Sequence, residues 1–242
     1  MQYCQGAEKK VTYRPTRKAP RLDLDIIKNW KDQEISKLVL EYYDIFDRAN
    51  KNRGGLQQAL GELTKLKACL NNRKFKNFVE IGIADGGSFW MYGLMFCTPA
   101  SKMIGIDSHR EHSATLIMRE LEARGRNVRY IIADCNRYVR AFTNESIDLL
   151  HIDANHDYDD VRRYFENYYP KVVSGGIILI HDTAACEGSI KFRKEVLESN
   201  IGLVLAEGFY DHRLLTGNWL ITGEYDINPD LPSPGISLIR KH

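Results

Sequence analysis

The sequence predicts an α/β fold, a mostly parallel sheet with helices on both faces, and two observations indicate it. Five short apolar runs alternate with segments of helical pattern along the central part of the chain. The runs are apolar almost throughout, which is typical of parallel strands buried on both faces. The expected strands are Phe78–Ile83, Met103–Asp107, Val128–Asp134, Ile147–Asp153 and Gly176–His181, and the helices between them are Gly87–Phe96, Ser113–Arg124, Cys135–Phe142 and Asp157–Tyr168.

Two segments precede this core. Residues 1–22 contain six Lys and Arg residues and no helical period, so we expect a basic flexible arm. Residues 23–75 are expected to form a helical extension, with an amphipathic helix over Asp23–Arg48 capped by Asp23, a break at Gly54 and Gly55, and a second helix ending near Leu70. These helices are expected to pack on the core, and a homo-oligomer interface is an open alternative.

The pattern changes toward the end of the chain. A helix is expected over Lys191–Ser199, followed by strands over Gly202–Glu207 and Trp219–Thr222 with a short polar turn between them. The core is therefore expected to span residues 76–225. Residues 226–242 contain three prolines and are expected to form an irregular tail.

Composition limits the classes of function. The 242 residues suit one large α/β domain with an extension, and a net charge of +2 gives no reason to expect a nucleic-acid partner. No apolar run approaches the roughly 20 residues that span a bilayer, so no membrane partner is expected. The five cysteines are odd in number and form no C-x-x-C pair, which indicates reduced thiols and a cytoplasmic protein.

A glycine turn, Gly82 to Gly87, follows the first core strand and precedes a helix. Such a turn lets a ligand lie against bare backbone at a helix N-terminus, and Asp107, at the tip of the next strand, can accept hydrogen bonds from ribose hydroxyls. Ala84 stands where the dinucleotide fingerprint has its second glycine, which disfavours NAD. A nicotinamide-dependent oxidoreductase and a turn that serves packing alone remain alternatives.

Glu80 with Gly82, Gly86 and Gly87 resembles motif I of the class I S-adenosylmethionine (SAM) methyltransferases, and the two late strands resemble the reversed final strand of their sheet. The resemblance implies a Rossmann-like, seven-stranded, mostly parallel sheet with SAM as the cofactor. Asp134 is placed to accept from the adenine amino group, with the Cys135 amide as a donor, and it is equally placed to cap a helix. The implied cofactor-binding residues are Glu80, Gly82, Ala84, Gly86, Gly87, Ser88, Asp107, Ser108, Asp134 and Cys135.

A second group of polar residues follows two strands that are expected to be neighbours. Asp153 and Asp182 would face each other across the cleft beyond the strand ends, and two carboxylates with an imidazole can hold a divalent cation. His156 is suited to take a proton from a substrate hydroxyl near neutral pH. The alternatives are that His156 begins a helix and that His181 is a hydrogen-bonded loop residue. His151 is assigned a structural role because it is expected to begin a strand.

The segment Asp153-Ala154-Asn155-His156, followed by the run from Gly175 to Asp182, resembles the metal-dependent small-molecule O-methyltransferases. These include macrolide sugar O-methyltransferases and the cephalosporin hydroxylase-like group. The resemblance implies Mg²⁺ or Mn²⁺ bound by Asp153, His181 and Asp182, with His156 as the catalytic base. His181 stands where these enzymes carry an acid, which favours Mn²⁺, Fe²⁺ or Zn²⁺ over Mg²⁺ or leaves no metal site.

The sequence therefore predicts a SAM-dependent O-methyltransferase that acts on a hydroxyl of a small molecule, a sugar being one candidate, with the help of a divalent metal. A non-catalytic SAM-binding or assembly module is a further alternative.

Overall fold

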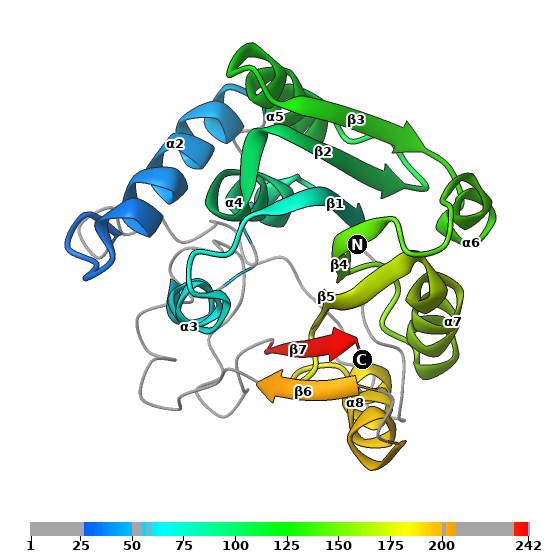
Figure 1. Ribbon diagram of the computed structural model, residues 1–242. Coiled ribbons are helices and arrows are strands. Elements are labelled where there is room, and N and C mark those ends of the chain that lie inside the picture. Colours follow the sequence, from blue (N-terminus) through cyan, green and yellow to red (C-terminus); the bar gives the residue numbers. More distant parts are fainter. Residues whose placement is uncertain are drawn as a thin grey trace, which may run out of the picture.

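The computed structural model describes residues 27–49, 55–56, 58, 60–199, 202–206 and 235–241. Its centre is a seven-stranded sheet of order β3-β2-β1-β4-β5-β7-β6 (Figure 1). The strands are β1 Phe75–Ile81, β2 Cys97–Asp107, β3 Asn127–Ile132, β4 Ile147–Ile152, β5 Val172–His181, β6 Gly202–Ala206 and β7 Ile236–Lys241. β3, β2, β1, β4 and β5 are parallel neighbours, and β7 is antiparallel to both β5 and β6. The predicted fold class, a mostly parallel sheet with a reversed last strand, is confirmed.

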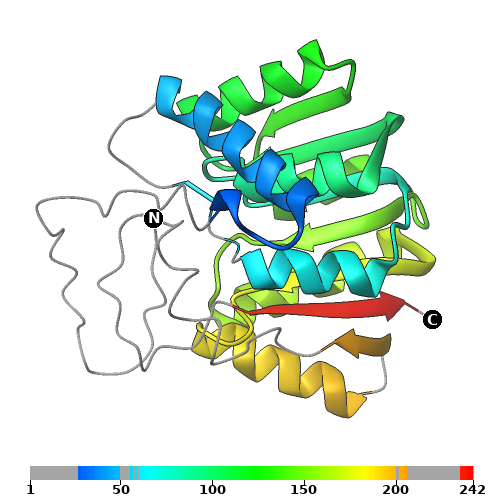
Figure 2. The same cartoon turned by 90° about the vertical axis from the view of Figure 1, so that its left-hand side faces the viewer.

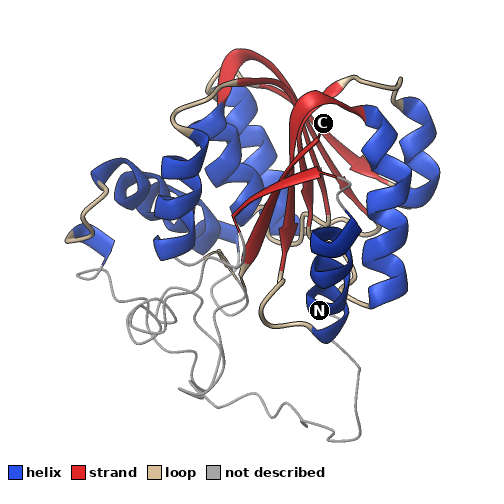
Figure 3. Ribbon diagram, turned by 60° about the horizontal axis from the view of Figure 1, so that its bottom comes forward, coloured by secondary structure: helices blue, strands red, loops and turns tan. Residues whose placement is uncertain are grey.

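Helices cover both faces of the sheet, as the apolar strands require (Figure 3). One face packs under α2 Gln33–Ala49, α3 Leu60–Leu70, α4 Gly87–Phe96 and α5 His112–Ala123, and the other packs under α6 Cys135–Tyr138, α7 Tyr158–Tyr168 and α8 Glu187–Ser199. Two single 3₁₀ turns, Val139–Ala141 and Tyr169–Lys171, follow α6 and α7. Successive strand residues alternate between the two cores: Phe78 and Leu149 enter the first, and Val79 and Leu150 enter the second.

The last strand does not come from the segment that sequence patterns favoured. Residues 226–242 were expected to be irregular, but Ile236–Lys241 form β7, which inserts between β5 and β6. The strand is held there by burial on both faces, because Leu238 enters one core and Ile239 the other. The strand predicted over residues 219–222 and the arm over residues 1–22 lie outside the described residues.

The N-terminal extension packs on the core, as Figure 2 shows for α2 and α3 in blue and cyan. The Trp90 indole in α4 donates to the Leu38 carbonyl in α2 at 2.9 Å. The long helix α2 begins at Gln33, and the Asp32 carboxylate accepts from the Ile35 amide at 3.2 Å, whereas the predicted start at Asp23 lies outside the described residues. Since Asp32 satisfies one of the first amides of the helix, it caps α2, and the capping role of Asp23 stays a prediction. A homo-oligomer formed through these helices stays a prediction.

In the described part of the chain, every helix is too short or too polar to cross a membrane. Cys69, Cys97 and Cys135 are free thiols, but Cys186 is disulfide-bonded. The prediction that all five cysteines are reduced is therefore wrong at Cys186, and the cytoplasmic location stays a prediction.

Candidate active site

The predicted site residues gather at the carboxyl edge of the sheet, around the point where the strand order reverses between β1 and β4. Hydrogen bonds of the parallel ladders continue past the strand ends: the Gly82 amide donates to the Ile106 carbonyl, and the Asp153 amide donates to the Ile81 carbonyl, both at 2.9 Å. The glycine turn and the residues after β4 are thus held side by side. In open α/β sheets this edge is where ligands bind.

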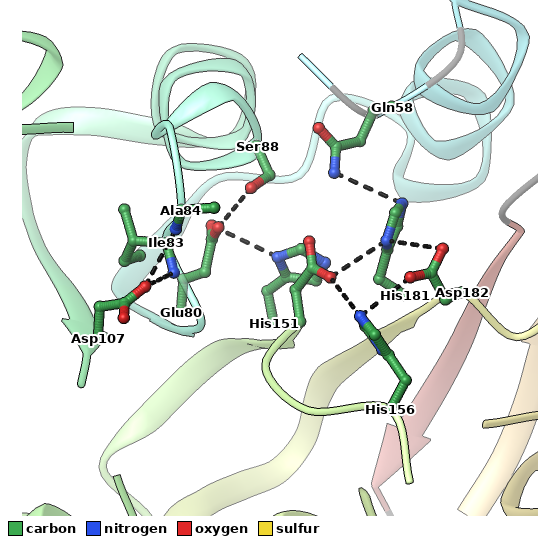
Figure 4. A network of polar contacts seen from close by, with 11 residues as sticks. Gln58, Glu80, Ile83, Ala84, Ser88, Asp107, His151, His156, His181 and Asp182 are labelled. Atoms are coloured by element: carbon green, nitrogen blue, oxygen red, sulfur yellow. Dashed lines mark hydrogen bonds and ion pairs between the residues drawn. The ribbon is translucent and has the colours of Figure 1, made fainter. Parts of the chain in front are cut away.

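Asp107 is bonded to the glycine turn. One carboxylate oxygen accepts from the backbone amides of Ile83 and Ala84 at 2.8 and 3.1 Å (Figure 4). The other accepts from the His109 amide at 3.0 Å. Each carboxylate oxygen has about two acceptor sites, so these bonds leave capacity for a ribose hydroxyl. The predicted proximity of Asp107 and the turn is present, and ribose binding stays a prediction.

Gly82 is required by packing of the chain against itself. Its φ is +83°, and a Cβ at this position would lie 2.0 Å from the Asp153 carbonyl oxygen. The glycine pattern predicted that a ligand approaches the backbone at Gly82, but the space beside Gly82 is filled by the backbone after β4. Gly87 is similar, because a Cβ there would lie 3.0 Å from the Cα of Leu56. Both glycines keep their predicted place in the turn beside the edge of the sheet.

Glu80 lies beneath the turn in a buried polar pair that the sequence did not predict. Ser88 donates its hydroxyl to one carboxylate oxygen of Glu80, and His151 Nδ1 lies 3.4 Å from the other (Figure 4). Burial raises the pKa of Glu80, although His151 and Ser88 oppose the rise. His151 is the fifth residue of β4, so the expectation that it begins the strand is wrong. Its structural role is supported, because it is fully buried against Glu80 and the Tyr92 ring.

Asp85, within the turn, was not predicted as a functional residue. Its carboxylate accepts from the Ser113 hydroxyl at 2.5 Å and from the Gly55 amide at 3.2 Å. It therefore joins the turn to the start of α5 and to the N-terminal extension. An acid among glycines was the available signal, but its two partners are distant in sequence.

Asp134 caps α6, because its side chain accepts from the Asn136 amide at 2.9 Å. This confirms one of the two open interpretations, and adenine binding stays a prediction. Burial raises the pKa of the neighbouring Cys135 thiol to about 11, so the thiol is neutral near pH 7. Ser108, beyond β2, shares a 2.8 Å hydrogen bond with His109 Nδ1.

The second group of predicted residues converges at the ends of β4 and β5. His181 Nδ1 lies 3.1 Å from Asp153 Oδ1 and 3.4 Å from Asp182 Oδ1. His156 Nε2 lies 3.0 Å from Asp182 Oδ2 and 3.8 Å from Asp153 Oδ1 (Figure 4). The ligating atoms of Asp153, His181 and Asp182 all lie within 4.8 Å of one another. Two carboxylates and two imidazoles thus form one cluster, which we call the β4–β5 cluster.

Charge pairing dominates the electrostatics of this cluster. Burial disfavours the imidazolium of His181, but the two carboxylates outweigh it and hold the pKa of His181 well above its usual range. Burial likewise opposes the charged form of His156, yet its contact with Asp182 raises the pKa. The same pairing lowers the pKa of Asp153 and of Asp182 against the effect of burial. The carboxylates are therefore ionised near neutral pH, and His156 and His181 compensate their charge when they are protonated.

Two residues of the N-terminal extension reach this edge and were missed by the sequence analysis. The Gln58 amide lies against His181, with Gln58 Nε2 3.5 Å from His181 Nε2. The buried carboxylate of Glu62 accepts from the Gly235 amide at 2.8 Å, just before β7. Neither had a motif to mark it, because both contacts cross more than a hundred residues of sequence.

The donor set fits a divalent cation. Ligand atoms about 2.0–2.2 Å from one ion lie at most about 4.4 Å apart, and this cluster is close to that compactness. The Nδ1 atom of His181 is buried without a hydrogen bond of good geometry and faces both carboxylates, so a cation bound between them would replace its ion pairs. A mixed oxygen and imidazole set suits Mn²⁺, Fe²⁺ or Zn²⁺ at least as well as Mg²⁺.

Comparison with known proteins identifies the class of the core. Residues 79–183, from β1 to the residues after β5, match the family model described as a methyltransferase domain, Methyltransf_24. This segment contains the glycine turn, Asp107, Asp134 and the β4–β5 cluster. This central segment therefore resembles a methyltransferase domain.

Solved structures share the fold. An O-methyltransferase from Bacillus cereus in complex with SAH has a TM-score of 0.60 at 15% identity, covering 89% of this chain and 100% of that one. TomG from Streptomyces achromogenes, an O-methyltransferase of tomaymycin synthesis in complex with SAM, has a TM-score of 0.58 at 13% identity, covering 88% and 91%. A methyltransferase from Geobacter sulfurreducens has a TM-score of 0.57 at 13% identity, covering 85% and 88%. At these identities the likeness establishes the class I methyltransferase fold.

One curated relative also matches part of the chain. The uncharacterized protein y4gI of Sinorhizobium fredii is 46% identical over 44 residues, which is 18% of this chain and 5% of that protein. So short a match carries no activity from one protein to the other.

Proposed function

We propose that this protein is a SAM-dependent O-methyltransferase that acts on a hydroxyl of a small molecule, with a divalent cation bound at the β4–β5 cluster. The observation that carries the proposal is the convergence of Asp153, His156 and Asp182 beside the glycine turn of a methyltransferase domain. One edge of the sheet thus offers a place for a methyl donor and, next to it, acid–base groups for the acceptor.

SAM would supply an electrophilic methyl group on a sulfonium sulfur. The turn from Ala84 to Ser88 and the carboxylate of Asp107 would hold its amino-acid tail and ribose, and Asp134 with Cys135 would contact the adenine. The amides of Ile83 and Ala84 already orient Asp107 at the turn, which supports this placement. Glu80 and Gly82 would act from beneath, Glu80 through Ser88 and Gly82 by letting the chain after β4 approach the turn.

Asp153, His181 and Asp182 would hold the cation, which would lower the pKa of an acceptor hydroxyl bound beside it. The structure supports this assignment by the compactness of the three ligating atoms. His181 supplies a neutral nitrogen ligand where the resembling enzymes have an acid, so Mn²⁺ or another transition metal is favoured.

His156 would be the general base. Its Nε2 contacts Asp182 at 3.0 Å, so Nε2–H can donate to that carboxylate and leave Nδ1 as the nitrogen that accepts a proton. Asp182 also raises the pKa of His156, which strengthens it as a base. As the new C–O bond forms and the C–S bond breaks, the hydroxyl proton would pass to His156.

The nicotinamide alternative loses its support. Ala84 occupies the place of the second fingerprint glycine, β7 runs antiparallel between β5 and β6, and the central segment matches a methyltransferase domain. The chemistry of the acceptor is proposed only as a hydroxylated small molecule, a sugar or phenol, without a nucleic-acid or membrane partner.

Calorimetric titration tests the proposal first. SAM and NAD are added separately to the purified protein, and we expect a binding isotherm for SAM and none for NAD. Transfer of a labelled methyl group to a panel of sugars and phenols is then measured with Mn²⁺ and with a chelator. We expect the chelator to lower transfer and to leave SAM affinity within a few-fold of its original value. An isotherm for NAD without one for SAM would reverse the assignment.

A further inference from the structure

Gln58 belongs to the N-terminal extension, yet its side chain ends at the β4–β5 cluster. It is 1% exposed, and its amide faces the ring edge of His181 opposite to the edge that faces Asp153 and Asp182 (Figure 4). His181 is equally buried, so each of its ring nitrogens must find a partner within the protein or a ligand. Gln58 is the described residue that an observed contact places at Nε2.

The two ring nitrogens of His181 have different surroundings. Nδ1 points between two carboxylate oxygens at 3.1 and 3.4 Å, and Nε2 points at the Gln58 amide at 3.5 Å. A histidine that binds a metal through one nitrogen donates the N–H of the other to a nearby oxygen, and this second bond fixes the ring and its tautomer. If Nδ1 is to face a cation, Nε2 must carry the proton, and Gln58 is the residue placed to accept it.

The Gln58 amide can form a hydrogen bond with either neutral tautomer of His181. With its nitrogen toward His181, as observed, Gln58 can donate to an unprotonated Nε2 while Nδ1–H pairs with Asp153. Rotation of the amide by half a turn would bring Oε1 to the same place, where it would accept from Nε2–H and free Nδ1 for a cation. Oε1 is buried without a hydrogen-bond partner in its observed position, so this rotation breaks no bond at that oxygen.

We propose that Gln58 is the positioning residue of the metal site: its amide oxygen holds His181 with Nε2 protonated and Nδ1 turned toward the cation between Asp153 and Asp182. The inference rests on the proposed function, because it assigns a role to Gln58 in the same metal site. It also assigns a task to the extension, which supplies one residue to a site otherwise built by the methyltransferase core.

Mn²⁺ binding by the full-length protein tests this role, measured by calorimetry and by the electron paramagnetic resonance of free Mn²⁺. Gln58→Leu keeps approximate size and removes both polar atoms, so the dissociation constant is expected to rise about 10–100-fold, the usual effect of losing such a second bond. Gln58→Glu keeps an acceptor oxygen and loses the donor, so Mn²⁺ affinity is expected to stay at or above that of the wild type. Gln58→Met serves as a second apolar variant if Gln58→Leu does not fold.

Ser36→Ala is the matched control. It removes a buried hydrogen bond from the same extension, between the Ser36 hydroxyl and the Ile27 carbonyl, without a contact to His181. It should lower thermal stability and leave Mn²⁺ affinity unchanged, which separates loss of stability from loss of positioning. A second readout is the His181 Nε2–H proton in the Mg²⁺- or Zn²⁺-loaded protein by nuclear magnetic resonance, which should be protected from exchange in the wild type and exposed to it in Gln58→Leu.

The outcomes are distinguishable. Wild-type affinity in both apolar variants, or equal weakening by Gln58→Glu and Gln58→Leu, overturns the role of Gln58 and leaves the proposed function standing. Absence of Mn²⁺ binding in the wild type overturns the metal site and this inference together, while the SAM titration still decides the methyltransferase assignment.

Discussion

The carboxylate side chains at the two halves of the sheet's C-terminal edge are stabilised in different ways. On the β1–β3 side, Asp107 and Asp134 accept hydrogen bonds from backbone amides, and Asp134 also has an exposed ion pair with Arg137 at 3.6 Å. On the β4–β5 side, Asp153 and Asp182 are partly buried against the imidazoles of His156 and His181. The carboxylates of the first half are stabilised mainly by backbone dipoles, and those of the second half by the charge of neighbouring side chains.

The difference indicates how each half meets a ligand. Backbone amides can share an oxygen with a neutral hydroxyl or amine at little cost, which suits the ribose and adenine of a nucleoside. Buried carboxylates demand a cation or an imidazolium, because an uncompensated buried charge costs several kcal/mol. We therefore propose a nucleoside site at the β1–β3 half and a metal and proton-transfer site at the β4–β5 half.

The largest expected effect separates the halves by rate. His156→Ala removes the proposed base, so kcat for methyl transfer should fall about 10²–10⁴-fold while the SAM dissociation constant stays within a few-fold. Steady-state kinetics with an identified acceptor and calorimetry with SAM measure the two quantities. A variant with unchanged kcat would show that the proton leaves by another route and would favour a non-catalytic role for the cluster.

The next prediction concerns the joint between the halves, where Gly82 packs against the backbone of Asp153. Gly82→Ala should lower the free energy of unfolding by about 2–5 kcal/mol, through a left-handed φ and a clash with backbone that cannot move away easily. Urea denaturation measures the change. Gly125→Ala is the matched control, since φ is +74° with no atom within 4 Å of the added Cβ. That variant should lose only about 1–2 kcal/mol, and equal losses would contradict the packing role of Gly82.

A third change tests the β1–β3 half. Asp107→Asn removes a charged acceptor and should weaken SAM binding by about 10–100-fold, consistent with about 1.5–3 kcal/mol for a hydrogen bond to a charged group. Mn²⁺ affinity should be unaffected, because Asp107 does not contact the β4–β5 cluster. Asp134→Asn is a useful companion: asparagine also caps helices well, so α6 should remain stable and any loss of SAM affinity reports the adenine contact. SAM affinity equal to that of the wild type in Asp107→Asn would remove Asp107 from the site.

The smallest expected effect is on stability and concerns the ion pairs of Lys67, which lie outside both halves of the site. It provides a reference value for the larger effects predicted within the site. Lys67 bridges Asp32 and Glu34 at 2.9 and 2.7 Å on the surface of the extension. Lys67→Met should cost at most about 1 kcal/mol, and less in high salt. Burial opposes ionisation of Asp32, but Lys67 and backbone amides lower its pKa below 3.8. The stability that ionised Asp32 contributes to the folded protein is therefore complete above pH 3.8 and is lost as the pH falls through the folded-state pKa of Asp32. Denaturation as a function of pH checks this sign, and a loss that appears only at high pH would contradict it.

Local patterns predicted much of the core because the information was local. β4 begins at Ile147 and α4 spans Gly87–Phe96, as expected, since each is bounded by turn residues and has the apolar period of its class. The convergence of Asp153 with Asp182 followed from one topological rule, that consecutive parallel strands bring their carboxyl ends to one edge. The observed strand boundaries differ from the predicted ones where pairing with a neighbouring strand lengthens a strand. β2, for example, begins at Cys97 instead of Met103.

The predictions were wrong where the structure or role of a residue depends on partners that are distant in sequence. β7 was missed because its segment follows several prolines, and only pairing with both β5 and β6 makes it a strand. His151 was placed at the wrong end of its strand. Its role depends on Glu80, which lies in β1.

The sequence by itself determined the class of the fold, the position of the glycine turn and the presence of carboxylates at the strand ends, because periodicity and turn chemistry act over a few neighbouring residues. Only the tertiary structure decided that Gly82 serves the backbone of Asp153, that Glu80 pairs with His151 and that Gln58 reaches His181. These contacts join residues from separate elements, and burial makes each one obligatory, since a polar group removed from water must be met by whatever the fold brings beside it.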